Sequence, residues 1–207
     1  MAVYSLLLAC RKKHYRFNDV VLIELEDLVM VKVSIVNVVA TAALDQSVDL
    51  KELGKFSQIV HDPEIYGGRV AYFRDHKFRG RVTIFASGKM ISVGSKSEAE
   101  AFCALELAKE YLIERGFVKQ VSLEEKTQNV VVMVDFGVAI DLEALARDKR
   151  VMYEPEQFPG GIFRMEKPFM VTALVYSSGK AVITGIKSSK HVEEIVGSLD
   201  ALLKSYV

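Results

Sequence analysis

The chain has 207 residues, half of them hydrophobic, which is enough to bury one core or two small ones. Its 27 lysines and arginines balance its 27 aspartates and glutamates, so no global positive field favours nucleic-acid binding. No apolar run approaches the roughly 20 residues of a membrane-spanning helix, and the isolated Cys10 and Cys103 predict free thiols in a reducing, intracellular compartment.

Residues 1–31 precede the repeated part of the chain. They contain a basic and aromatic cluster, RKKHYRF from Arg11, and an apolar stretch, VVLIELEDLVMV from Val20. The stretch predicts an additional strand or helix. We expect this N-terminal extension to act as a structural cap, a partner contact or a basic arm.

From there the chain contains two related copies, which we assign to residues 32–118 and 119–207. VNVVATA at Val36 is matched 92 residues later by QNVVVMV at Gln128, and FASGKM at Phe85 is matched 91 residues later by YSSGKA at Tyr176. The change of offset predicts a one-residue length difference in the intervening hairpin. Two long copies indicate an internal duplication and a pseudo-two-fold molecule.

Each copy predicts the same α+β element order. A β-branched strand is followed by a short helix with Asp49 or Asp141 near its N-terminus, where a carboxylate suits the helix dipole. Antiparallel strands turned by Ser-Gly come next. An amphipathic helix closes each copy, over 97–116 in the first and near the end of the chain in the second.

Helices on one side of such a sheet leave its other face open. Strand alternation places apolar residues on that open face, namely Val39, Ile91, Val131, Leu174 and Val182. An uncovered apolar face of this size is typical of a binding surface. The alternative is a sandwich, in which two sheets pack face to face and the repeat reflects duplication alone.

The motifs of both copies resemble those of the TATA-box-binding protein family, closest in style to its archaeal members. They are VNVVATA, DPEIYGG, FASGKM and GSKSE in the first copy, and QNVVVMV, YEPEQFPGGIFRM, YSSGK and ITGIKS in the second. The resemblance covers 32–207. It implies a saddle-shaped, ten-stranded antiparallel sheet with helices on its convex face, and a concave apolar face that binds the DNA minor groove.

The resemblance assigns two pairs of aromatic wedges that open base steps. They fall on Tyr66 with Phe85 and on Phe158 with Tyr176. Each pair has one tyrosine, whose hydroxyl costs on the order of 1–3 kcal/mol when it is buried in a base step without a partner.

The resemblance also assigns base reading to the amides of Asn37 and Asn129, beside the five apolar residues of the open face. A guanine amino group opposite these donors would clash. Thr184 matches an accompanying threonine of the family, whereas the first copy has Val93 there. We therefore expect weaker A·T selectivity at the first half.

Phosphate contacts follow from the same resemblance, and Arg164, Ser178 and Lys180 match them in the second copy. The first copy retains Ser87 and Lys89 but has Tyr72 where an arginine is expected. Nearby basic residues are expected either to substitute for it or to be solvated, and these are Arg69, Arg74, Lys77, Arg79 and Arg81.

The resemblance further implies that the acidic segment YEPEQF binds a protein partner of the transcription factor B type, which then recruits RNA polymerase. Glu154, Glu156 and Gln157 match its contact surface, and the first copy offers Asp62 and Glu64. No cofactor, metal or membrane is expected.

The sequence therefore predicts an initiation factor that binds and bends A/T-rich double-stranded DNA through the minor groove. An enzyme is disfavoured because the four histidines are scattered and no glycine-rich phosphate loop opens a helix. Two alternatives stay open. One is a divergent paralogue that serves as a regulatory protein-interaction module with weak or no TATA binding, and the other is a saddle that binds another protein or RNA.

Overall fold

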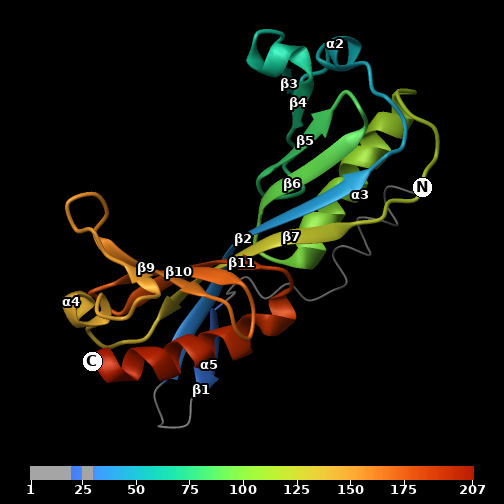
Figure 1. Ribbon diagram of the computed structural model, residues 1–207. Coiled ribbons are helices and arrows are strands. Elements are labelled where there is room, and N and C mark those ends of the chain that lie inside the picture. The colour runs from blue at the N-terminus through green and yellow to red at the C-terminus, as the bar shows by residue number, and fades with distance from the viewer. Residues whose placement is uncertain (1–19, 25–29) are drawn as a thin grey trace. The chain divides into compact units, whose positions relative to one another are not determined.

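The computed structural model describes residues 20–24 and 30–207, and the side chains from Val31 onward (Figure 1). The RKKHYRF cluster lies outside the described residues. The described chain divides into two compact units. The first unit comprises 37–128, and the second comprises 129–207 with 20–24 and 30–36. The division falls within two strands, β2 (Met30–Ala43) and β7 (Lys126–Asp135).

The first unit is an antiparallel sheet with one long helix along one face (Figure 1). Its strands are ordered β3, β4, β5, β6, β2. The new bounds are β3 Ile59–His61, β4 Val70–Phe73, β5 Arg81–Phe85 and β6 Lys89–Ser95, with helices α2 Leu50–Leu53, η1 Ile65–Gly68 and α3 Glu98–Glu114.

The second unit repeats this arrangement with strand order β7, β11, β10, β9, β8. The bounds are β8 Val151–Met152, β9 Gly160–Met165, β10 Val171–Tyr176 and β11 Lys180–Ile186, with helices α4 Leu142–Leu145, η2 Ser189–His191, α5 Val192–Leu203 and η3 Lys204–Tyr206. A further strand, β1 (Val20–Glu24), pairs with the start of β2, so the apolar stretch of the extension forms a strand there and not a helix.

The cores lie between each sheet and its helices. In the first unit Val82, Ile84 and Met90 are fully buried, and α3 packs on β5 and β6. The ring centroids of Phe73 on β4 and Tyr111 on α3 lie 4.7 Å apart. In the second unit α5 buries the corresponding stripe of Ile195, Val196 and Leu199. The predicted two-repeat antiparallel α+β fold is confirmed.

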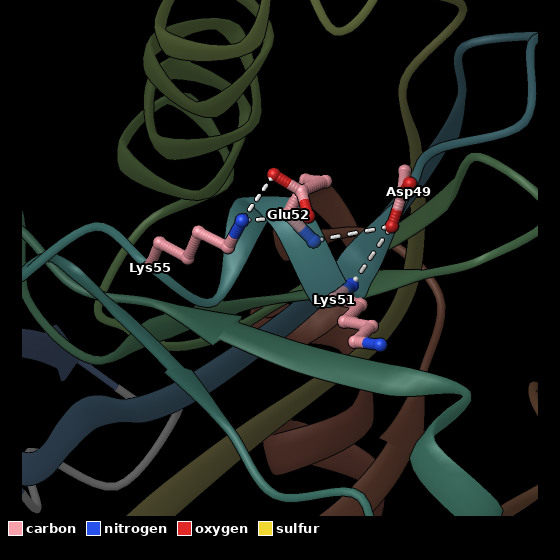
Figure 2. Close-up of polar contacts among 4 residues, drawn as sticks. All are labelled: Asp49, Lys51, Glu52 and Lys55. Atoms are coloured by element: carbon pink, nitrogen blue, oxygen red, sulfur yellow. Dashed lines mark hydrogen bonds and ion pairs between the residues drawn. The ribbon is translucent and has the colours of Figure 1, made fainter.

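The short helices begin where the sequence predicts. Asp49 caps α2, because its carboxylate accepts from the backbone N–H groups of Lys51 and Glu52, both at 3.1 Å (Figure 2). Lys55 and Glu52, which lie three residues apart, form an ion pair of 2.6 Å at the other end of this helix. Asp141 caps α4 in the same way through Glu143 and Ala144, at 3.0 and 2.9 Å.

The strand registers correct the predicted length difference between the copies. Val60 corresponds to Met152, 92 residues on, because Val60 pairs with Tyr72 and Met152 pairs with Ile162, which hold the same place on the next strand. The offset is 90 at Val70 and Gly160, which pair with Phe85 and Tyr176 respectively. The turn after β3 is therefore two residues longer than the turn after β8, and the hairpin that follows is one residue shorter. Both differences fall in turns, where no ladder hydrogen bond constrains length.

One further expectation is wrong. Cys103 is disulfide-bonded rather than a free thiol, and Cys10 lies outside the described residues. Among the helices of the described residues, none is long and apolar enough to cross a membrane. Within 20–24 and 30–207, histidine, cysteine and carboxylate side chains form no group suited to a metal ion.

Candidate nucleic-acid interface

Each unit has one sheet face that its helices leave open. In the first unit, the register aligns five residues across this open face: Val60, Tyr72, Thr83, Ile91 and Thr41. They are partly exposed, whereas their strand neighbours Ala71, Val82 and Ile84 are fully buried. The predicted residue Ile91 therefore lies on the open face.

The corresponding row of the second unit is more apolar. It consists of Met152, Ile162, Leu174, Val182 and Met133. Leu174 and Val182 were predicted here, whereas Met133, Met152 and Ile162 were not. Strand alternation continuing from Val131 was the signal that would have found Met133, which is 44% exposed. In a sandwich these residues would be fully buried, so their exposure argues against that alternative.

The two predicted asparagines are fixed by identical hydrogen bonds. Their side-chain Oδ1 atoms accept from glycine N–H groups at β-bulges, Asn37 from Gly94 at 2.9 Å and Asn129 from Gly185 at 2.8 Å. An amide oxygen used in this way leaves the NH₂ group as the end that meets a ligand. Each unit thus presents an oriented amide donor.

The neighbours of these amides differ between the units. Asn129 Nδ2 donates to the hydroxyl of Thr184 at 3.0 Å. Val93 occupies the corresponding place in the first unit and pairs across the sheet with Val39, both of them partly exposed. Among the described residues, none accepts from Nδ2 of Asn37.

The predicted wedges of the second unit lie together. The ring centroids of Phe158 and Tyr176 are 5.9 Å apart, with the rings inclined by 58°. Gly160 provides the space, since a Cβ there would lie 2.9 Å from Phe158 Cε1 and 2.9 Å from the Val175 carbonyl oxygen. The glycine therefore allows the two partly exposed rings to lie side by side as one aromatic pair.

The predicted wedges of the first unit are arranged differently. Tyr66 lies in η1, is 72% exposed and has a φ of 51°, which is unusual for a residue other than glycine. Phe85 ends β5 opposite Val70, the residue that replaces Gly160. In the described part of the chain no ring contact joins Tyr66 to Phe85.

The two Ser-Gly turns carry the predicted phosphate contacts. Ser87, Lys89, Ser178 and Lys180 are all exposed beside them. The turns are pinned to the preceding loops, because Gly88 O accepts from Leu44 N and Gly179 O from Phe136 N, both at 3.0 Å. Exposed cations on fixed turns suit contact with an anionic backbone.

The predicted loss of an arginine in the first copy is wrong. The register makes Tyr72 the counterpart of Ile162, and Arg74 the counterpart of Arg164, which lies one residue beyond Phe163 as Arg74 lies beyond Phe73. Both arginines are exposed. The longer turn after β3 displaced the arginine in a simple sequence comparison.

The predicted partner surface is an exposed acidic turn between β8 and β9. Glu154, Glu156 and Gln157 are all exposed, and Glu154 O accepts from the N–H groups of Gln157 and Phe158, each at 2.9 Å. Asp62 and Glu64 occupy the corresponding turn of the first unit.

Comparisons with known proteins agree with this arrangement. The model of a family described as "Transcription factor TFIID (or TATA-binding protein, TBP)" matches residues 32–114 and 124–206. A TATA-box-binding protein of Methanococcus aeolicus is 36% identical over 84% of this chain and 98% of its own length, and one of Pyrodictium occultum is 37% identical over 83% and 85%. The solved structure of Methanococcus jannaschii TBP covers 84% of this chain and 98% of its own, with a TM-score of 0.75 and 31% identity.

Proposed function

The chain belongs to the TATA-box-binding protein family of DNA-binding transcription initiation factors, and from this premise we propose that it binds and bends A/T-rich promoter DNA through the minor groove. Its two open sheet faces contact the two halves of the site. The proposed activity involves no catalytic step and no cofactor, and it implies an intracellular location with the genome.

The observation that carries the proposal is the anchored amide donor, Asn37 or Asn129, in the open apolar face of each unit. The minor groove of A·T pairs presents acceptors only, while guanine adds an amino donor. Donors surrounded by apolar side chains therefore favour A·T over G·C. Net neutrality of the chain is compatible with this mode, because apolar contact replaces much of the charge attraction.

DNA deformation is the second part of the mechanism. The Phe158 and Tyr176 pair inserts at one end of the site, and Tyr66 with Phe85 inserts at the other. Partial unstacking widens the groove, so the apolar faces reach the base edges. The sequence is read largely through the ease with which TA steps deform.

The acidic turn of Glu154, Glu156 and Gln157 is proposed to bind a transcription factor B-type protein. Its three side chains are exposed beside the Phe158 wedge. A partner on this turn would stabilise the wedge in its inserted position. RNA polymerase is recruited indirectly through that partner.

Energy transfer across an end-labelled duplex tests the proposal. TATA-containing and G·C-substituted duplexes are titrated at fixed salt, with and without a factor B-type protein. Bending of the TATA duplex alone is the expected result. Bending only with the partner present would mean a partner-dependent factor, and absence of bending with the partner still bound would instead establish the protein-interaction paralogue.

A further inference from the structure

A tyrosine and an arginine form a stacked pair on the open face of the first unit. The guanidinium carbon of Arg81 lies 4.6 Å from the centroid of the Tyr72 ring. Arg81 begins β5 and is exposed, and Tyr72 lies on β4 opposite Thr83. Stacking on a ring orients a guanidinium while its N–H groups remain directed outward in the guanidinium plane.

The second unit has no such pair. Tyr72 corresponds to Ile162, because these residues pair with Thr83 and Leu174, which occupy the same place on the neighbouring strands. Arg81 corresponds to Thr172, because Arg81 lies opposite Val93 and Thr172 lies opposite Thr184. At this place the first open face carries a cation and the second carries a hydroxyl.

Backbone packing places Arg81 close to the first amide donor. Gly80, with a φ of 78°, lies so near the bulge at Gly94 that a Cβ on it would be 1.9 Å from the Val93 carbonyl oxygen. The N–H of Gly94 donates the hydrogen bond that Asn37 Oδ1 accepts. The start of β5 is thus fixed against the bulge that holds Asn37.

We propose that Arg81, oriented by Tyr72, reads base edges in the first half of the DNA site and makes that half stricter for A·T than the second. This reverses the expectation of a weaker first half from Val93, because Arg81 lies opposite Val93 and supplies a donor there. This inference rests on the proposed minor-groove function. Guanine presents an amino donor that opposes the donor-only guanidinium, whereas the Thr172 hydroxyl both donates and accepts. A protein with unequal halves binds an unsymmetrical A/T-rich site in one preferred direction.

Three duplexes test this without labelling the protein. The first has a self-complementary site of A·T pairs only, the second has one G·C pair in one half, and the third has that G·C pair in both halves. The G·C position is scanned along the half site, and wild type is the reference. At the position under Arg81, one G·C pair should cost wild type about twofold in affinity, because the protein turns its tolerant half toward it. Two should cost about tenfold.

Exchanging the residues between the halves gives opposite expectations. Arg81→Thr makes both halves tolerant, so the doubly substituted duplex should bind about as tightly as the A·T-only duplex. Thr172→Arg makes both halves strict, so a single G·C pair should already cost about tenfold. Tyr72→Ile should reduce discrimination only in part, since the guanidinium remains but loses its orientation.

Lys77→Thr is the matched control, because it removes one positive charge from an exposed position of the same hairpin. It should leave the wild-type pattern over the three duplexes unchanged. An unchanged pattern in Arg81→Thr would overturn the proposal. So would an equal loss on all three duplexes with a salt slope smaller by about 0.9, since that identifies a phosphate contact.

Failure of the proposed function gives a different result. In that case wild type would not prefer the A·T-only duplex to any other. A wild type that prefers and bends that duplex, with an Arg81→Thr variant of identical discrimination, would remove Arg81 as a base-reading residue and leave the minor-groove function in place.

Discussion

The two asparagines combine a structural hydrogen bond and the proposed base-reading group in one side chain. Each Oδ1 holds the N–H of a bulge glycine, so the orientation of the NH₂ group is set by the fold and not by the ligand. A donor oriented before binding loses little entropy on contact with DNA. Under the proposed function, this orientation accounts for selectivity by a few polar groups in an apolar surface.

Asn129→Ala should relax the preference for A·T over G·C at the base pair under the amide, by about 1–3 kcal/mol. Affinities for duplexes that differ at that one pair measure this. Asn129→Asp retains an acceptor for Gly185 N and is the control for damage to the bulge. An unchanged preference in the alanine variant would show that the amide does not read bases.

Glu125 is the residue through which pH should affect the first unit. Burial raises the pKa of its carboxyl, and the nearby Glu106 carboxylate raises it further, while its own backbone and Lys109 oppose the shift. The folded state therefore holds this proton more tightly than the unfolded chain does. The resulting stability is fully present below the ordinary pKa of 4.5 and is lost as the pH rises through the raised value.

Glu125→Gln should accordingly raise the melting temperature near pH 7. The gain in free energy of unfolding should be less than about 1 kcal/mol, because the residue is only partly buried and solvent screens the effect. The difference from wild type should vanish below about pH 4.5. Glu124→Gln removes an equal charge one residue away, at an exposed position, and is the control. A stabilisation that persists at low pH would contradict the assignment.

At the scale of elements, the turn between β8 and β9 brings the proposed wedge Phe158 and the proposed partner surface into one short segment. Glu154 O organises the turn through Gln157 N and Phe158 N, and Gly160 gives the Phe158 ring its place against Tyr176. The turn after β3 is two residues longer and contains Tyr66 at a positive φ. The two pairs of proposed wedge residues are therefore expected to differ in how readily they insert into the DNA.

Phe158→Ala should abolish bending while leaving initial encounter nearly unchanged, because the wedge acts after contact and mainly determines complex lifetime. Energy transfer and stopped-flow dissociation measure the two effects. Tyr176→Phe keeps the ring and removes a hydroxyl. Its bent complex should be as stable as that of wild type, or more stable by about 1–3 kcal/mol of binding free energy. Normal bending by the alanine variant would remove the wedge assignment.

Elements were predictable from the sequence where local chemistry determines them. The Asp49 and Asp141 caps and the Ser-Gly turns agree with prediction because side-chain hydrogen bonds and glycine dihedrals set them within a few residues. Registers depend on pairings between distant residues. Two opposite changes of turn length partly cancelled in the sequence offset, so Arg74 was missed as the counterpart of Arg164. The Arg81 and Tyr72 stack depends on the same register and had no sequence signal.

For the whole molecule, neutrality and a small number of placed cations determine how binding responds to salt. Four cations lie where phosphate contacts are proposed: Lys89 and Lys180 beside the Ser-Gly turns, and Arg74 and Arg164 at the ends of β4 and β9. Each phosphate contact contributes about −0.9 to the slope of log K against log salt concentration. The remaining charges cancel, so they add little non-specific attraction.

The slope for a TATA duplex should therefore be about −3 to −4. Arg74→Ala and Lys180→Ala should each reduce its magnitude by about 0.9 and weaken all sequences alike, because phosphate contacts carry no base preference. Equilibrium titrations over a range of salt concentrations measure both. A slope steeper than about −7 would mean that the other basic residues of the β4–β5 hairpin also bind phosphate. A slope near zero would mean that apolar contact and bending supply the affinity without the proposed cations.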